Sequence, residues 1–237
     1  MGPLAEKIGE PPQYLAQNCT IGRNTSYLTF KNYILDAIEC DAFPHITFLS
    51  SLESFLDVGA GNGEITSYLG NKYNLKGVGI DVKPPKENEW AEWGGRRENI
   101  HDISVFDGRH LPFKNDTFDL VIFNMVLHHA ADNAAALLHE ASRVSKCFIL
   151  LLEDISVPSS KKITTRHHNH DPKGIFRSET EWISLLENTG YKVVVQATIP
   201  CEDGYGDSQR KFSRRKGNIE FQRFFVATDN KCIPYLK

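Results

Sequence analysis

The chain has 237 residues, of which 41% are hydrophobic and 24% are charged. This length and composition are typical of a globular protein with a sizeable core and exclude an intrinsically disordered chain. The 27 basic and 30 acidic side chains give a formal net charge of -3, which excludes the strongly basic overall charge of a dedicated nucleic-acid coat protein.

The cysteines are odd in number and scattered, with no C-x-x-C pair among Cys19, Cys40, Cys147, Cys201 and Cys232. This pattern disfavours a disulfide framework or a zinc site and favours a reducing compartment. No apolar signal-peptide core and no apolar run of the roughly 20 residues that span a bilayer is found. We therefore predict a cytoplasmic protein with no metal site and no membrane insertion.

The first 45 residues differ in character from the rest of the chain. Residues 1–24 are polar and rich in Pro, Gly and Asn, and the apolar spacing across Tyr27–Cys40 predicts an amphipathic helix. We expect residues 1–45 to form a lead-in that covers part of a substrate site. Residues 46–237 then form a single globular domain.

From residue 54 onward, short apolar segments alternate with helical ones, which predicts a parallel sheet covered on both faces. The last two strands follow one another without a helix and predict an antiparallel hairpin at one edge. The fold class is therefore α/β, a doubly wound, mostly parallel sheet of seven strands. We expect strands at 54–58, 76–80, 103–106, 118–124, 147–152, 191–198 and 219–228, and helices at 64–72, 133–145 and 178–189, the last with a capping box at its start.

A glycine-rich loop follows the first strand and opens the first helix of the alternation. Gly59, Gly61 and Gly63 allow a tight turn with close approach to a ligand, and the helix N-terminus behind them favours a carboxylate or a phosphate. Asp81 ends the next strand, where an acid can accept hydrogen bonds from both ribose hydroxyls. The third glycine comes one residue too early for a nicotinamide dinucleotide, and Asp57 would repel a pyrophosphate. S-adenosylmethionine is therefore the favoured cofactor.

Three segments resemble motifs of the class I S-adenosylmethionine-dependent methyltransferases, whose fold is Rossmann-like. They are LDVGAGNGE, VGIDV and FDGRHLPFKNDTFDLVIFNMVLHH, in that order along the chain. The third is similar to the small-molecule branch that includes the ubiquinone and menaquinone C-methyltransferases. The resemblance implies methyl transfer to O, N or C of a small-molecule acceptor.

The resemblance also implies roles for individual residues. Asp57 would stand near the methionine amino group, Asp81 would hold the ribose diol, Asp107 would accept from the adenine amino group, and Asn124 would face the methionine moiety. The complete set of expected cofactor-binding residues is Asp57, Gly59, Ala60, Gly61, Gly63, Asp81, Val82, Phe106, Asp107, Gly108 and Asn124.

Histidines are the candidate catalytic bases. His128 and His129 follow the fourth strand, beyond whose carboxyl end ligands bind in such sheets, and His168 belongs to the loop 155–177, which is a candidate lid. Glu153 and Asp154 end the fifth strand and are further candidates for acid–base work. For each histidine, a purely structural role in its loop stays open.

Other functions stay open as well. The basic segment 210–216 between the last two strands is either a solvated hairpin or a docking surface for RNA or protein substrates. A non-enzymatic cofactor-binding protein and a nicotinamide-dependent dehydrogenase are the remaining alternatives. Neither the acceptor nor the oligomeric state is predicted.

Overall fold

The structure of the protein is a computed structural model that describes residues 51–61, 63–83, 103–155, 174–200, 221–229 and 232. The helix predicted at Tyr27–Cys40, most of the loop 155–177 and the basic segment 210–216 lie outside the described residues. The strand before the glycine-rich loop, the helix after it and the next strand, at 54–58, 64–73 and 76–81, lie within them.

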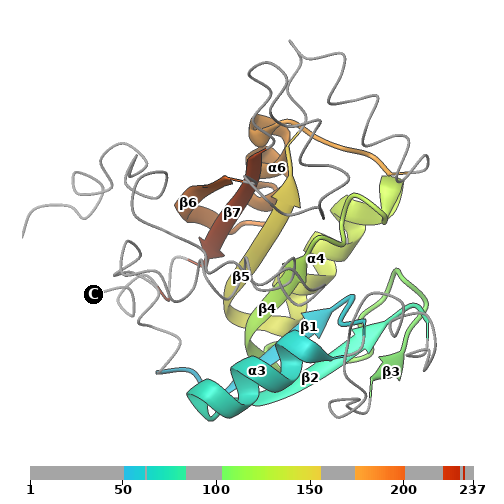
Figure 1. Ribbon diagram of the computed structural model, residues 1–237, viewed down its shortest axis with the longest axis vertical. Helices are drawn as coiled ribbons and strands as arrows, with labels where there is room; N and C mark the ends of the chain where they lie inside the picture. Colours follow the sequence, from blue (N-terminus) through green and yellow to red (C-terminus); the bar gives the residue numbers. More distant parts are fainter. Residues whose placement is uncertain are drawn as a thin grey trace, which may run out of the picture.

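Seven strands form one sheet with the order β3-β2-β1-β4-β5-β7-β6 (Figure 1). The pairs among β1 to β5 are parallel, whereas β7 is antiparallel to both of its neighbours. The predicted fold class is thus confirmed, including the antiparallel pair at the C-terminal edge. The strands are β1 (Ser54–Val58), β2 (Lys76–Asp81), β3 (Ser104–Val105), β4 (Phe118–Asn124), β5 (Ser145–Asp154), β6 (Lys192–Pro200) and β7 (Phe221–Thr228).

The described helices are α3 (Glu64–Tyr73), the short 3-10 helix η5 (Ala131–Asn133), α4 (Ala134–Val144) and α6 (Glu179–Glu187). The predicted capping box of α6 is confirmed, because the Ser178 hydroxyl accepts from the Glu181 amide and the Glu181 carboxylate accepts from the Ser178 amide. Helix α4 passes into β5 without an intervening loop, so β5 begins two residues earlier than predicted.

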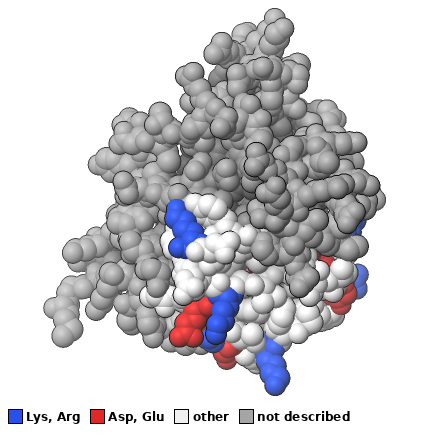
Figure 2. Space-filling model, turned by 60° about the horizontal axis from the view of Figure 1, so that its bottom comes forward, with Lys and Arg blue, Asp and Glu red and all other residues white. Residues whose placement is uncertain are grey.

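The described surface carries charges of both signs. On the face drawn in Figure 2, Lys and Arg side chains lie next to Asp and Glu side chains rather than forming a patch of one sign. None of the helices within the described residues combines the length and apolar character that crossing a membrane requires.

The sheet is buried on both faces. Side chains alternate along a strand, and in β1 Leu56 joins the core cluster that includes residues of α4 and α6. Its neighbours Phe55 and Asp57 point to the other face, where Phe55 contacts Gly77 and Asp57 accepts a hydrogen bond from Thr66 of α3. Helix α3 therefore covers one face and helices α4 and α6 cover the other, as a doubly wound sheet requires.

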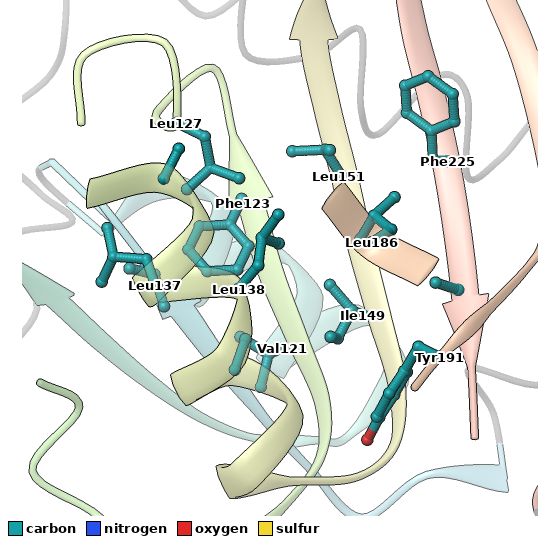
Figure 3. Close-up of a cluster of buried hydrophobic side chains, with 14 of the residues drawn as sticks. Val121, Phe123, Leu127, Leu137, Leu138, Ile149, Leu151, Leu186, Tyr191 and Phe225 are labelled. Carbon is teal, nitrogen blue, oxygen red and sulfur yellow. The ribbon is translucent and has the colours of Figure 1, made fainter. Parts of the chain in front are cut away.

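A cluster of buried apolar side chains fills the space between β4, β5, β7 and the helices α4 and α6 (Figure 3). Trp182 of α6 is fully buried there. Tyr191 directs its ring into the same cluster, and its hydroxyl donates to the Ser145 carbonyl at 3.0 Å. This core supports β4 and β5 along their length and so fixes where their carboxyl ends lie.

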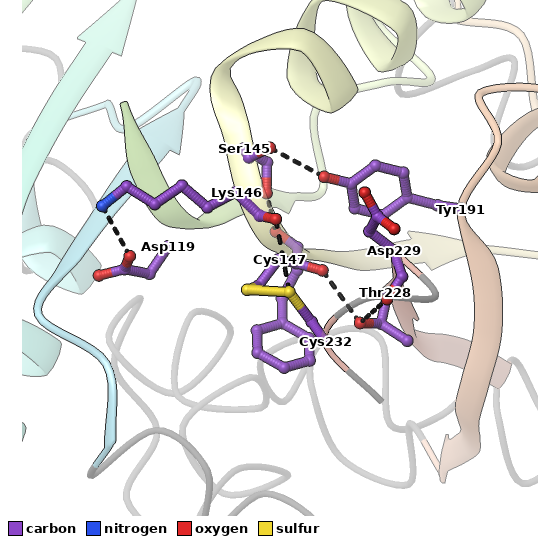
Figure 4. The surroundings of a disulfide bond; sticks show 9 residues. Asp119, Ser145, Lys146, Cys147, Tyr191, Thr228, Asp229 and Cys232 are labelled. Atoms are coloured by element: carbon purple, nitrogen blue, oxygen red, sulfur yellow. Dashed lines mark hydrogen bonds and ion pairs between the residues drawn. A yellow bond between two sulfur atoms is a disulfide. The ribbon is translucent and has the colours of Figure 1, made fainter. Parts of the chain in front are cut away.

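One prediction about the cysteines is wrong. Cys147 at the start of β5 and Cys232 after β7 form a disulfide, with their Cα atoms 5.4 Å apart (Figure 4). The Cys147 carbonyl also accepts from the Thr228 hydroxyl and the Asp229 amide. The two cysteines lie 85 residues apart in sequence, so only the pairing of β5 with β7 brings them together.

Asp119 of β4 joins three segments at the amino-terminal end of the sheet. Its carboxylate accepts from the Glu53 and Ser54 amides, each at 2.9 Å. It also accepts from the Lys146 ammonium at 2.9 Å (Figure 4). Burial alone would raise the pKa of Asp119, but the hydrogen bonds from Lys146, Glu53 and Ser54 outweigh it and lower that pKa.

We expect Asp119→Ala to lower the free energy of unfolding by about 2 kcal/mol, because the amides that it binds lose their acceptor. The stabilisation is present above the ordinary carboxyl pKa and is lost as the pH falls below it. Urea denaturation at neutral pH measures the loss. Glu187→Ala, which changes an exposed acid in the last turn of α6, is the matched control. Equal midpoints for the two variants would contradict this role.

Candidate functional site

The glycine-rich loop has the turn that the sequence predicts. Gly59, Gly61 and Gly63 have φ angles of 74°, 59° and 78°, in the left-handed region that favours glycine. The amides of Gly59 and Ala60 donate to the Ile80 carbonyl, which ties the loop to β2. Gly63 is the N-cap of α3, and no side chain caps this end of the helix. The backbone of the loop therefore leads directly into the helix N-terminus.

The two predicted acids flank this loop but have different surroundings. Asp57 is 2% exposed, and its carboxylate accepts from the Thr66 hydroxyl at 2.7 Å. Asp81 at the end of β2 is half-buried and accepts from the Gly61 amide at 2.9 Å and from the Lys83 amide at 3.2 Å. Asp81 therefore helps to hold the loop, whereas Asp57 is bonded to helix α3, and Asp81 is the more accessible of the two.

The residues predicted to surround an adenine lie next to Asp81. The Phe106 amide donates to the Asp81 carbonyl at 3.0 Å, and an added Cβ on Gly108 would lie 3.0 Å from a methyl group of Val82. Asp107 lies between Phe106 and Gly108. Its carboxylate accepts hydrogen bonds from the amide and the imidazole of His110 and from the Arg109 amide, and these bonds lower the pKa of Asp107 to about 2. Its side chain is exposed at the end of β3, so this carboxylate is ionised and accessible.

Asn124 ends β4 on the same edge of the sheet. It is 8% exposed, and its side-chain oxygen has no hydrogen-bond partner within the described residues. Met125 follows with a φ of 58° and turns the chain away from the sheet. A buried amide oxygen without a partner is costly, so it is a natural contact for the donor group of a ligand.

The loop after β4 packs directly against the glycine-rich loop. An added Cβ on Gly59 would lie 2.4 Å from a methyl group of Val126. The two loops are thus in van der Waals contact, and only glycine fits at position 59. The carboxyl ends of β1, β2 and β4 form one continuous site.

Glu153 is the buried acid of this site. It is fully buried at the end of β5, and its Oε1 accepts from the amides of Val126 at 2.9 Å and Leu127 at 2.6 Å. Its Oε2 lies 2.6 Å from Nδ1 of His128, which is itself 5% exposed. One carboxylate therefore holds the β4 loop and the histidine together.

A short segment before α6 covers the histidine. The Ile175 amide donates to the His128 carbonyl at 2.8 Å, and the Phe176 ring stacks on the imidazole with centroids 5.0 Å apart. Arg177 donates to the Ala131 carbonyl at 3.0 Å and fixes the same segment to η5. Of the loop 155–177, this end is described and packs against the candidate site.

The three candidate catalytic histidines differ in position. His128 is buried beside Glu153, whereas His129 is exposed and contacts the His128 ring at a centroid distance of 4.0 Å. His168 lies outside the described residues. The sequence indicated Glu153 as a possible acid–base group but did not reveal its hydrogen bonds to the β4 loop. Phe176 was missed altogether, and no motif marks it.

Comparisons with known proteins find matches to methyltransferases. The family described as a methyltransferase domain matches residues 56–147. An uncharacterized methyltransferase of Schizosaccharomyces pombe is 36% identical over 110 residues, which cover 43% of this chain and 39% of that protein. The chain thus matches well under two thirds of that relative's length.

Solved structures show the same architecture. A S-adenosylmethionine-dependent methyltransferase of Methanosarcina mazei has a TM-score of 0.57 at 19% identity, covering 77% of this chain and 95% of that one. The magnesium protoporphyrin IX methyltransferase of Synechocystis, solved with S-adenosylhomocysteine, has a TM-score of 0.58 at 14% identity, covering 88% and 90%. The chain therefore has the fold of the S-adenosylmethionine-dependent methyltransferases, and its residues 56–147 match the methyltransferase domain family.

Proposed function

We propose that the protein is an S-adenosylmethionine-dependent methyltransferase that acts on a small-molecule acceptor. The observation that carries the proposal is the convergence of the glycine-rich loop, Asp81 and the Asn124 oxygen at one edge of the sheet, where that oxygen has no partner among the described residues. The match to methyltransferase domains and the S-adenosylhomocysteine bound in the Synechocystis enzyme support this cofactor. The finer resemblance to ubiquinone and menaquinone C-methyltransferases stays a prediction.

The residues at the site fit the groups of S-adenosylmethionine. The carboxylate of Asp81 offers acceptors to a ribose diol, and the exposed carboxylate of Asp107 offers acceptors to an amino group on a base. The buried oxygen of Asn124 and the carboxylate of Asp57 are both hydrogen-bond acceptors. Their complementary partner is the ammonium group of the methionine part of the cofactor. A pyrophosphate, in contrast, would bring negative charge towards Asp57, which argues against a nicotinamide dinucleotide.

When bound, the cofactor supplies a methyl group on a positively charged sulfur. The protein's own task is then to position the acceptor and, for a hydroxyl, to remove a proton. We propose that His128 removes this proton, because it is buried in the loop after β4, next to the proposed cofactor site, and is oriented by Glu153. A small acceptor fits a histidine that is 5% exposed better than a large polymer does.

We expect Asp81→Asn to weaken the binding of S-adenosylmethionine and S-adenosylhomocysteine by roughly 10- to 100-fold, because hydrogen bonds to a charged group contribute about 1.5–3 kcal/mol. Isothermal titration calorimetry with each compound measures the change. Glu187→Gln, which neutralises an exposed acid on α6, should leave both affinities unchanged.

The same titration separates the competing cofactors. Wild-type protein that binds neither compound, or that binds NADH in their place, would remove the basis of the proposal. Equal affinity in wild type and Asp81→Asn would show that this acid does not hold the ribose.

A further inference from the structure

The protonation of the His128–Glu153 pair follows from a count of donors. Backbone amides can only donate, so Oε1 of Glu153, which receives the amides of Val126 and Leu127, is an acceptor. Two backbone amides on one carboxyl oxygen are hydrogen-bond partners typical of a carboxylate. Oε2 then requires a donor from His128, and the 2.6 Å contact is an Nδ1–H donated to a carboxylate.

This arrangement determines which imidazole nitrogen accepts a proton. A neutral histidine carries one N–H, so a proton on Nδ1 leaves the lone pair on Nε2. The stacked ring of Phe176 limits rotation of the imidazole. The negative charge of Glu153 also stabilises the imidazolium that forms when Nε2 takes up a proton.

We propose that Glu153 is a positioning residue that fixes the Nε2 lone pair of His128 for removing the proton of an acceptor hydroxyl. The inference rests on the proposed function. The acceptor oxygen forms its bond to the methyl carbon as the methyl–sulfur bond breaks, and the electron pair of that bond stays on sulfur. The hydroxyl proton moves to Nε2, so S-adenosylhomocysteine and imidazolium are the products on the protein side.

A hydroxyl acceptor is the class that this pair suits. The proton of an acidic hydroxyl such as that of a phenol is within the reach of an imidazole base, whereas a neutral amine already offers its lone pair. A hydroxyl acceptor therefore requires a base, whereas a neutral amine acceptor does not. Burying the negative charge of Glu153 beside the imidazole costs desolvation free energy. Deprotonation of a hydroxyl benefits from that charge, because it stabilises the imidazolium that forms.

Glu153 also connects the histidine to the cofactor loop. It holds the amide of Val126, whose side chain contacts Gly59. Two substitutions separate these roles. In Glu153→Gln the amide oxygen must face the two backbone donors, which places the NH2 group opposite Nδ1 and forces the proton to Nε2. In Glu153→Ala the anchor of the loop is lost as well.

Long-range 1H–15N NMR at alkaline pH, where imidazole is neutral, reads the tautomer directly. The chain has nine histidines, and the signal of His128 is assigned by its absence in His128→Gln. We expect an Nδ1–H tautomer in wild type and an Nε2–H tautomer in Glu153→Gln. An Nε2–H tautomer in wild type would overturn the positioning role, whether or not the protein binds S-adenosylmethionine.

Binding and turnover test the remaining steps. Glu153→Gln should bind S-adenosylhomocysteine within about twofold of wild type, whereas Glu153→Ala should bind it at least about tenfold more weakly. With a panel of simple phenols as acceptors, Glu153→Gln should lower kcat by about 100- to 10,000-fold with little change in KM. Wild-type protein that binds the cofactor but methylates none of the phenols would overturn the hydroxyl acceptor. Failure of wild type to bind the cofactor at all would instead reject the proposed function.

Discussion

Gly59→Ala is expected to abolish binding of S-adenosylmethionine and to destabilise the protein by roughly 2–5 kcal/mol. A left-handed alanine costs about 1–2 kcal/mol, and an overpacked contact costs about 1–3 kcal/mol. The new methyl group would lie 2.4 Å from Val126. Val126 cannot easily yield, because its side chain is branched and its amide is bound to Glu153. Calorimetric titration and urea denaturation measure the two effects.

Gly190→Ala is the matched control. Gly190 also has a positive φ, of 88°, but an added Cβ there would meet nothing within 4 Å. This variant should lose about 1–2 kcal/mol from the backbone conformation alone and should bind the cofactor as wild type does. If Gly59→Ala and Gly190→Ala lost equal stability, the contact between the two loops would not restrict position 59.

Replacing both Cys147 and Cys232 by Ser is expected to lower the free energy of unfolding by up to about 4–5 kcal/mol. The disulfide closes a segment of 85 residues, and a cross-link over such a length removes that much conformational freedom from the unfolded chain in the entropic description. For a protein of this size, each kcal/mol shifts Tm by roughly 2–4 °C. Thermal denaturation of both proteins without reductant gives the difference.

Reductant supplies the control for this prediction. Tris(2-carboxyethyl)phosphine should lower the Tm of the wild-type protein towards that of the double variant and should leave the double variant unchanged. A wild-type Tm that does not respond to reductant, together with alkylation of both Cys147 and Cys232 detected by mass spectrometry, would contradict a stabilising disulfide at this position.

The local features of the fold were predictable because they depend on neighbours in sequence. The glycines at 59, 61 and 63 permit the left-handed backbone that the turn adopts. The capping box at Ser178–Glu181 is a contact across a single turn. The apolar runs of β4 and β5 reveal strands buried on both faces. Asp81 could be assigned to the site because parallel strands end at one edge.

Other features needed contacts between distant segments. The sequence disfavoured a disulfide framework and favoured a reducing compartment, yet the pairing of β5 with β7 brings Cys147 to Cys232. His128 and His129 are equivalent candidates in the sequence, although His128 is buried and His129 is exposed. Periodicity cannot distinguish them, because they are adjacent in a loop whose path is set by hydrogen bonds to Glu153.

What the chain alone determined is therefore the sheet, the glycine turn and the acids that end its strands, since these follow from local backbone preferences and the alternation of apolar segments. What only the tertiary structure decided is which side chains share a proton or a surface: Glu153 with His128, and Val126 with Gly59. The physical reason is that burial and hydrogen bonding between residues about 25 and 67 positions apart depend on how the strands pair, and no local pattern encodes that pairing.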